Sequence, residues 1–321
     1  MRLLTRAQPA IKMMLRASGF RLGEVETRVA KLRYVEHRAP GASLGTVVLL
    51  HGIASSASSF GKVLGRLRGR VRRIIALDAP GHGFSDEPRS NLSPELFFEA
   101  VVEALDALDA PDGEPALVVG NSLGGAMALR YASERPEKVR GVFVCSPGGA
   151  PTPDGTLDDL LGRFDLRDRH DARGFLTRLY HRPPWYAPLL ADDVHYLLTR
   201  PAVRQFFSSV TPASFLKPVE LSAVRAPVLV IWGKGDTLLP AGDLAFFREH
   251  LPAGSRFEEP AHFGHSPQLE WPIELADRIL RFDRELGRRE AVPRRVSASG
   301  ADVRGQGAPA SRRGEDVSGG G

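Results

Sequence analysis

Residues 115–134 read PALVVGNSLGGAMALRYASE and join a short apolar run, a glycine-rich turn and a helical pattern. The run ALVV is typical of a strand buried on both faces. The small residues of 120–125 permit a sharp strand-to-helix turn that lifts the Ser122 hydroxyl above a sheet. The dipole of the following helix favours a developing negative charge at this point. Ser122 is therefore a candidate nucleophile, and the alternative is a phosphate-binding or purely structural glycine turn.

Comparable apolar runs occur on both sides of this stretch and alternate with helical patterns. With PALVVGN (115–121), the strand candidates are TVVLLH (46–51), RRIIALD (72–78), RGVFVCS (140–146) and APVLVIWG (226–233). The helix candidates are 59–68, 94–109, 124–135, 242–250 and 273–285. This alternation predicts an α/β fold with a mostly parallel sheet flanked by helices. Residues 22–37 are expected to add one or two antiparallel edge strands.

The alternation stops between about 150 and 217, where no strand-like run occurs and aromatic residues are frequent. We interpret this segment as a helical cap inserted between two strands of the sheet. Four of its aromatic residues are candidates for contact with a substrate: Trp185, Tyr186, Phe206 and Phe207. The alternative is that the aromatic side chains form only the core of the cap itself.

Composition and charge exclude several protein classes. The chain has 321 residues, 42% hydrophobic and 25% charged, which is ordinary for a globular protein. The formal net charge of +5 comes from the two ends of the chain, since the segment between them is acidic overall. We therefore expect no nucleic-acid partner, because such a body would need a basic face. The single Cys145 excludes an internal disulfide framework and a cysteine-cluster metal site.

The first 21 residues form a basic amphipathic segment. Ile11, Met14 and Leu15 are expected on one side of a short helix, with Lys12 and Arg16 on the other. Such a helix can lie on an anionic membrane surface, or it can pack on the domain. No stretch approaches the roughly 18–20 apolar residues of a membrane span. We expect a cytoplasmic protein, with peripheral membrane contact through this segment left open.

The expected organisation has five parts. They are the N-terminal segment (1–21), the first part of the core (22–149), the cap (150–217), the second part of the core (218–286) and a tail (287–321). The tail contains no Leu, Ile, Phe, Tyr or Trp. It cannot bury enough apolar surface to offset its ordering entropy, so we expect it to be disordered.

A serine hydroxyl needs a base, and two histidines near the end of the chain are candidates. His265 lies in Gly-His-Ser-Pro on a tight loop before the last helix. That loop could bring the imidazole back over the edge of the sheet. His262 is the alternative base, or a loop residue. His51 and His82 lie in other loops and are expected to shape them.

The base in turn needs a carboxylate on its far nitrogen. Asp236 follows the strand VLVIWG at its carboxyl end, the edge of a parallel sheet where sites form. Asp243 is the rival, but it falls in the next helix and is expected to be solvated. The candidate oxyanion donors are the backbone N–H groups of Leu123, after the nucleophile, and Ile53, after the first buried strand.

Taken together, these motifs resemble the α/β-hydrolase-fold enzymes over about residues 22–286. The segments HGI, DAPGHGFS (78–85), GNSLGG, WGKGD and GHSPQLEWP occur in the order and spacing of that family. The chain is most similar to bacterial lipases and esterases and to monoacylglycerol lipase-like α/β-hydrolase-domain proteins. The resemblance implies hydrolysis of small-molecule esters, and the aromatic residues of the cap suggest a pocket for an apolar acyl group. The resemblance also implies an acyl-enzyme on Ser122, the triad with Asp236 and His265, and no metal or organic cofactor.

Two other functions remain open. GNSLGG and the later SPGG also resemble the meta-cleavage hydrolases, which split C–C bonds. Those enzymes frequently have Trp after the triad histidine, where this chain has Ser266. A non-catalytic binding protein of the same fold is the hypothesis from a different class, since fold does not fix function.

Overall fold

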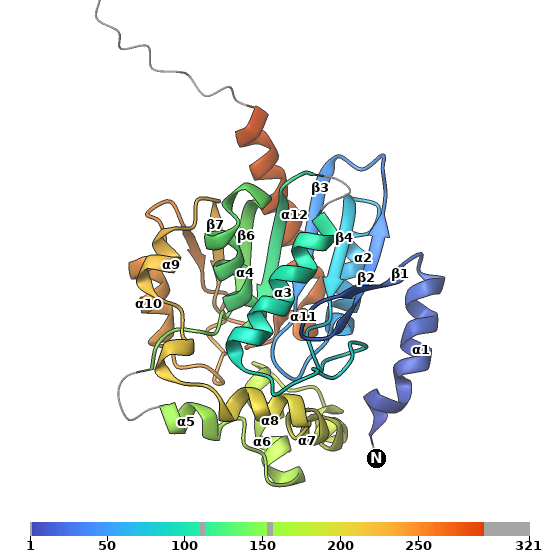
Figure 1. Ribbon diagram of the computed structural model, residues 1–321, viewed down its shortest axis with the longest axis vertical. Coiled ribbons are helices and arrows are strands. Elements are labelled where there is room, and N and C mark those ends of the chain that lie inside the picture. The colour runs from blue at the N-terminus through green and yellow to red at the C-terminus, as the bar shows by residue number, and fades with distance from the viewer. Residues whose placement is uncertain (1, 110–112, 153–156, 292–321) are drawn as a thin grey trace, which may run out of the picture.

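The computed structural model describes residues 2–109, 113–152 and 157–291, and its centre is an eight-stranded sheet (Figure 1). The strands are β1 Arg21–Glu26, β2 Lys31–Arg38, β3 Leu44–Leu50, β4 Val71–Leu77, β5 Ala116–Asn121, β6 Val139–Cys145, β7 Val228–Ile231 and β8 Arg256–Glu258. Their order across the sheet is β1-β2-β4-β3-β5-β6-β7-β8. β2 is antiparallel to β1 and β4, and the other neighbours are parallel. The predicted fold class is thus confirmed, with β1 at the edge and β2 inside the sheet.

Helices cover both faces of this sheet (Figure 1). One face carries α3 Pro94–Asp109, α4 Leu123–Glu134, α9 Pro218–Ser222 and α10 Asp243–His250, and the other carries α2 Gly61–Leu67 and α12 Pro272–Ala291. α3 begins where the sequence predicts, with Pro94 in its first turn and the Ser93 hydroxyl accepting the Leu96 N–H at 3.2 Å.

Alternation along each strand divides the core into two layers. In β3, Val48 and Leu50 pack under α3 and α4, whereas Val47 and Leu49 pack under α2 and α12. Because both faces are covered, the last four residues of the strand, 47–50, are all apolar, as is usual in parallel strands. Because β3, β5, β6 and β7 run parallel, the carboxyl ends of β3, β5 and β7 meet at one edge of the sheet.

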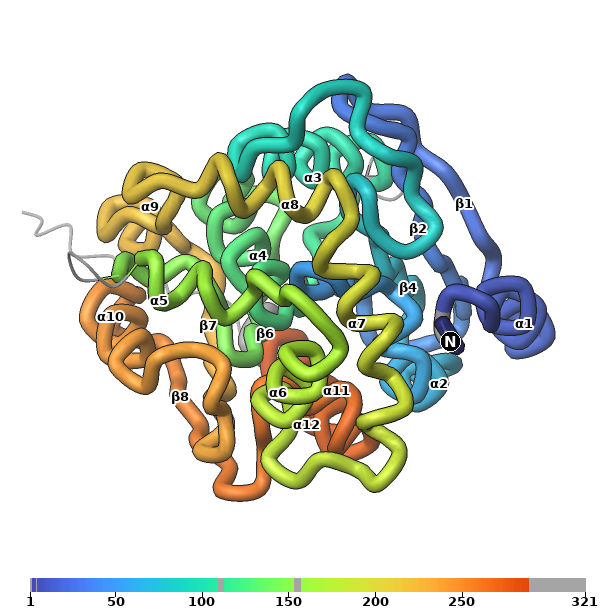
Figure 2. Tube along the Cα trace, turned by 90° about the horizontal axis from the view of Figure 1, so that it is seen from below, coloured from blue at the N-terminus to red at the C-terminus, as the bar shows by residue number. Residues whose placement is uncertain are grey.

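The cap lies across that edge, between β6 and β7 of the chain (Figures 1 and 2). Its helices are α5 Leu157–Gly162, α6 Arg169–Leu179, α7 Ala191–Leu198 and α8 Pro201–Ser208. They share a small core of their own, which also receives Leu238 from the loop after β7. Much of the aromatic content of the segment is used in this core, with Phe164 and Phe175 among its members.

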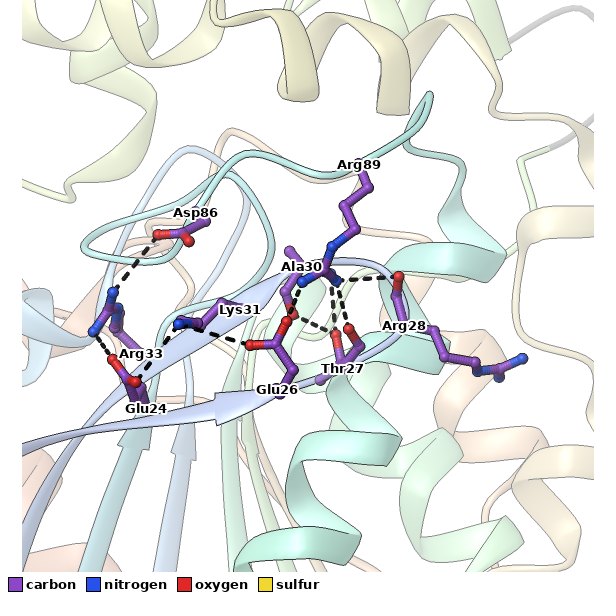
Figure 3. A network of polar contacts seen from close by, with 9 residues as sticks. All are labelled: Glu24, Glu26, Thr27, Arg28, Ala30, Lys31, Arg33, Asp86 and Arg89. Carbon is purple, nitrogen blue, oxygen red and sulfur yellow. Dashed lines mark hydrogen bonds and ion pairs between the residues drawn. The ribbon is translucent and has the colours of Figure 1, made fainter.

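Charged residues line the β1–β2 hairpin at the sheet edge (Figure 3). Lys31 lies 3.9 Å from the Glu26 carboxylate, and Arg89 pairs with the same carboxylate. Arg89 also donates to the carbonyl of Thr27 at 2.6 Å. A charged edge opposes pairing with another chain. The Arg89 contacts fasten the hairpin to the segment between β4 and α3.

The N-terminal helix, α1 Leu3–Ala17, packs on the domain. Leu15 is buried and Ile11 packs against the same core layer as α12. Met14 was expected beside them, but it is 66% exposed. The buried face is centred on Ile11 and Leu15, one turn apart, so Met14 is rotated away from it. At the other end of the helix, Leu3 N donates to the Asp193 carboxylate of α7 at 2.7 Å.

The C-terminal end of the described chain is helical. α12 runs to Ala291, so residues 287–291 of the predicted tail form the last turns of a helix. The remainder of that prediction, 292–321, lies outside the described residues. Within the described ranges, no helix has both the length and the apolar character that crossing a membrane would require.

Candidate active site

Ser122 lies at the turn between β5 and α4 in a backbone conformation that is rare for a residue with a side chain. Its φ is 56° and its ψ is −123°. The Ser122 carbonyl accepts N–H groups from Gly125 at 2.8 Å, Ala126 at 3.1 Å and Gly148 at 2.9 Å. These bonds hold the strained turn, which is the geometry of a nucleophile elbow.

Close packing explains the glycines around the serine. A Cβ on Gly120 would lie 2.2 Å from the carbonyl oxygen of Gly124. A Cβ on Gly124 would lie 2.1 Å from the carbonyl oxygen of Leu50. The backbone of the elbow therefore approaches β3 more closely than any side chain allows.

The structure brings together the histidine and the aspartate that the sequence places 29 residues apart. His265 Nδ1 lies 2.8 Å from Asp236 Oδ2, and the two side chains are 3% and 0% exposed. An ionised carboxylate accepts this bond, so the proton is on Nδ1 and Nε2 carries the lone pair that a base requires. Asp236 Oδ1 accepts the N–H groups of Leu238 at 2.9 Å and Leu239 at 3.2 Å, which fix the carboxylate.

The electrostatics of Asp236 suit an orienting carboxylate. Burial would raise its pKa, but the charge and hydrogen bond of His265 oppose burial, and the Ser146 hydroxyl and Leu238 N–H add to them. Together they bring the pKa of Asp236 below its ordinary value. The group is therefore ionised at neutral pH and can stabilise an imidazolium.

Asp243, the rival carboxylate, is 9% exposed, so the expectation that it is solvated was wrong. It opens α10, and its N–H donates to the carbonyl of Pro240 at 3.0 Å. Burial raises the pKa of Asp243 to about 7, and the charge of Asp236 adds to the rise. The carboxylate that contacts His265, the candidate base, is that of Asp236.

Two side chains that sequence reasoning missed hold the His265 loop against the elbow. Asn121 Nδ2 donates to the carbonyl of His265 at 2.9 Å and to that of Cys145 at 3.1 Å. Gln268 Nε2 donates to Asn121 Oδ1 at 2.9 Å. The sequence signal that could have identified them was an amide side chain next to Ser122, at Asn121, and another three residues after His265, at Gln268. Ser122 and His265 are only 7% and 2% exposed beneath the cap.

Among the described residues, the ring of His265 makes one hydrogen bond, the one to Asp236. The link from its Nε2 to the Ser122 hydroxyl is therefore not formed in this structure. Such contacts are often long in the absence of substrate and shorten in the complex. Proton transfer from Ser122 to His265 therefore stays a prediction.

The backbone around Ile53 and Leu123 fits a pair of oxyanion donors. Leu123 is the first residue of α4, where N–H groups have no partner within the helix. The loop before Ile53 passes beside the serine, since a Cβ on Gly52 would lie 3.0 Å from Ser122 Cβ. His51 Nδ1 binds the carbonyl of Gly52 at 2.7 Å. In a trans peptide this directs the Ile53 N–H away from the His51 ring.

A second histidine and aspartate lie beneath that loop. His51 Nε2 accepts the N–H of Ala79 at 3.1 Å. Asp78 accepts the N–H of Ala57 at 2.7 Å and that of Phe84 at 2.9 Å. Burial lowers the pKa of His51 to about 4 and raises the pKa of Asp78 to about 6. These side chains are bonded to backbone groups, so they fix the loops.

His82 has a similar place. Its Nδ1 binds the carbonyl of Pro80 at 2.8 Å, and its ring centroid lies 5.4 Å from that of His51. Burial lowers the pKa of His82 to about 3. The ring is neutral at physiological pH and is bonded within its own loop.

The four aromatic candidates of the cap do not form one group. Trp185 is 86% exposed and Tyr186 is 44% exposed on the connection between α6 and α7. Phe206 packs on Phe97 of the core, with ring centroids 5.4 Å apart. Phe207 stacks on Phe164 of the cap at 4.8 Å. Composition alone could not show which aromatic side chains face the core, because tertiary packing decides it.

Phe207 lies between the cap and the main core. It packs against both the cap core and the main core, as do Ile53 and Leu160. Leu123 packs against the main core. The seam between cap and sheet is thus apolar on both sides, next to the two candidate oxyanion donors.

Comparisons with known proteins agree with this architecture. The sequence pattern of the family described as "Alpha/beta hydrolase family" matches residues 47–279. The chain is 30% identical over 242 residues to a pimeloyl-[acyl-carrier protein] methyl ester esterase of Nitrosomonas europaea, covering 71% of this chain and 92% of that one. It is 28% identical over 268 residues to a 2-hydroxy-6-oxononadienedioate/2-hydroxy-6-oxononatrienedioate hydrolase of Paraburkholderia phymatum, covering 77% and 90%.

Solved structures share the fold. A membrane phospholipase A described as a bacterial virulence factor superposes with a TM-score of 0.74 at 23% identity, covering 88% of this chain and 92% of that one. A 2-hydroxy-6-oxo-6-phenylhexa-2,4-dienoate hydrolase from Rhodococcus sp. strain RHA1 gives 0.70 at 22% identity, covering 83% and 99%.

Proposed function

The chain belongs to the alpha/beta hydrolase family, and we propose that it is a serine hydrolase that cleaves carboxylic esters. The observation that carries this proposal is the 2.8 Å bond between His265 Nδ1 and the buried Asp236, beside the strained turn at Ser122. Ester specificity is supported by the esterase among its relatives.

In the proposed mechanism, the Ser122 hydroxyl attacks the ester carbonyl carbon while His265 Nε2 removes its proton. Asp236 holds the ring and stabilises the imidazolium. The N–H groups of Ile53 and Leu123 bind the tetrahedral oxyanion. The imidazolium then protonates the leaving alcohol, and the acyl-enzyme forms. His265 activates a water to release the acid and free the serine, with no metal or organic cofactor.

The proposed substrate has an apolar acyl group. Ile53, Leu160 and Phe207 line the seam between cap and sheet with hydrocarbon, which would receive an acyl chain and exclude water. Short- to medium-chain esters and monoacylglycerols both fit this description. Cytoplasmic location and peripheral membrane contact through the N-terminal segment stay predictions.

The test is hydrolysis of p-nitrophenyl esters from acetyl to palmitoyl, with Ser122→Ala as control. We expect turnover that disappears in the variant, because its nucleophile is gone. The acyl-chain length with the highest kcat/KM would indicate how long an acyl group the seam between cap and sheet accepts. A folded wild-type protein that hydrolyses no ester, or a Ser122→Ala variant with full turnover, would contradict the proposal.

A second candidate is hydrolysis of a C–C bond, as in the meta-cleavage hydrolases. It is favoured by the similarity to the Paraburkholderia phymatum hydrolase. Assay of a ring-fission product such as 2-hydroxymuconate semialdehyde, beside the ester series, separates the two. Turnover of that compound without ester turnover would select the C–C reaction.

A further inference from the structure

Glu270, the last residue of α11 (Pro267–Glu270), receives backbone N–H groups from two separate segments. Its Oε1 accepts from His181 at 2.7 Å and from Arg182 at 3.2 Å, both in the cap. Its Oε2 accepts from Gly264 at 2.8 Å, the residue before His265. One carboxylate therefore joins the cap to the loop of the candidate base.

Two further contacts lie at the same junction. The N–H of Ser266, directly after His265, donates to the carbonyl of Leu179 in the cap at 3.0 Å. A Cβ on Gly264 would lie 2.3 Å from the nitrogen of His181, so the two backbones touch. Both neighbours of the base are thus held by the stretch of cap that follows α6, which lies beside α11 in Figure 2.

The burial of the candidate site beneath the cap links the position of the cap to that of the His265 loop. Because Ser122 and His265 are 7% and 2% exposed, we expect the cap to move when a substrate enters. A loop that is bonded to the cap moves with it, unless the bonds break. Misplacement of a catalytic group by about 1 Å can cost roughly a hundredfold in rate.

We propose that Glu270 is a positioning residue that places His265 for proton transfer only while His181 and Arg182 of the cap are bound to it. The inference rests on the proposed function. It predicts that proton transfer to His265 occurs only after the cap has returned to its position over the bound substrate. Loss of the junction then lowers kcat rather than weakening substrate binding.

Glu270→Gln is the informative change because it keeps the size of the side chain. A carboxylate accepts on both oxygens, and bonds from N–H to an ionised acceptor are stronger than neutral ones. An amide accepts on one side and turns its NH₂ toward an N–H group on the other. The variant therefore releases either the cap or the His265 loop.

Glu274→Gln is the matched control. Glu274 lies four residues further on and bonds to the side chains of His262 and Arg278, each at 2.8 Å, not to the backbone around His265. For the fastest p-nitrophenyl ester, we expect Glu270→Gln to lower kcat roughly tenfold or more with KM changed less than about threefold. Glu274→Gln should keep the wild-type values.

A proton NMR signal gives a readout that lost stability alone would not move. The proton between His265 Nδ1 and Asp236 gives a low-field resonance, which is identified by its loss in Asp236→Asn. We expect this resonance to shift or broaden in folded Glu270→Gln and to stay unchanged in Glu274→Gln. Thermal unfolding of each variant confirms that the samples are folded.

The outcomes separate the two proposals. An inactive wild type overturns the ester proposal, and the NMR comparison still decides the role of Glu270. Wild-type kcat together with an unchanged resonance in Glu270→Gln overturns the inference. If Glu270→Gln does not fold, Glu270→Asp replaces it, since the shorter carboxylate reaches one of the two segments. Wild-type behaviour of that variant would equally overturn the inference.

Discussion

His265 and His51 both lie beside a buried aspartate at the carboxyl edge of the sheet, yet their rings are bonded differently. In His51 both nitrogens are bonded to backbone, Nδ1 to the Gly52 carbonyl at 2.7 Å and Nε2 to the Ala79 N–H at 3.1 Å. In His265, Nδ1 is bonded to Asp236 at 2.8 Å, and Nε2 keeps its lone pair for a proton.

The two aspartates differ in the same way. Asp236 has its pKa lowered, because its partner histidine and hydrogen bonds outweigh burial. Asp78 binds two backbone N–H groups, and burial raises its pKa to about 6. Its carboxylate lies 3.9 Å from His51 Nε2, beyond hydrogen-bond distance. The partner of each ring nitrogen, more than the residue types, distinguishes the proposed acid–base pair, Asp236 and His265, from Asp78 and His51, which are bonded to backbone groups.

Of the substitutions that test this comparison, Asp236→Asn should have the largest effect, on the rate of ester hydrolysis. The amide cannot act as the anion that fixes the ring tautomer, so kcat for ester hydrolysis should fall by roughly ten-thousand-fold. Steady-state kinetics on the p-nitrophenyl series measure it. Asp243→Asn is the control, because that carboxyl is buried nearby without a bond to His265, and it should lose less than about tenfold. Equal losses in both variants would undo the assignment of the acid.

Asp78→Asn should change the free energy of unfolding and the way in which that free energy depends on pH. Since burial raises the pKa of Asp78 from 3.8 to about 6, the folded protein binds this proton more tightly than the unfolded chain does. The stabilising contribution is complete below pH 3.8 and is lost as the pH rises through about 6. A difference of about two pKa units corresponds to roughly 3 kcal/mol.

Urea unfolding of wild type and Asp78→Asn at about pH 4 and 7 measures this loss. The stability of the wild type relative to the variant should fall by about 2 kcal/mol between the two pH values. His51 has the opposite trend, because its pKa is lowered to about 4 and its contribution is lost as the pH falls. Both proteins contain His51, so its effect largely cancels. Parallel stability curves would show that Asp78 does not titrate as described.

His262→Gln should have the smallest effect. The His262 side chain is 42% exposed and pairs with Glu274 at 2.8 Å. An exposed pair contributes about 0–1 kcal/mol, so the unfolding free energy should change by less than about 1 kcal/mol. Ester kinetics should stay at wild-type values, since the ring is bonded to Glu274, whereas Asp236 is bonded to His265. Loss of turnover in this variant would make His262 the base instead.

Local patterns predicted the strands of the sheet and the main helices that flank it. The helix predicted at 94–109 is Pro94–Asp109 in the structure, and the run at 115–121 forms β5. These elements follow from periodicity and turn residues, which are local properties. The approach of Asp236 to His265 also followed, because carboxyl ends of parallel strands share an edge.

Contacts between distant segments could not be predicted in this way. Gln268 reaches Asn121 across 147 positions, and Glu270 reaches the cap across 89. Neither bond leaves a periodic signal. The burial of Asp243 and the exposure of Trp185 depend on which surfaces pack against their segments. A sequence pattern does not show which surfaces pack together, so the exposure of individual side chains could not be predicted from it.

The most direct test of the central claim, that the Asp236–His265 pair activates Ser122, is covalent labelling with a fluorophosphonate followed by peptide mapping. We expect one adduct, on Ser122, formed rapidly in wild type and in His262→Gln and much more slowly in His265→Gln. No adduct is expected in Ser122→Ala. Absence of labelling in the folded wild type, or an equal labelling rate in His265→Gln, would show that the Asp236–His265 pair does not activate Ser122.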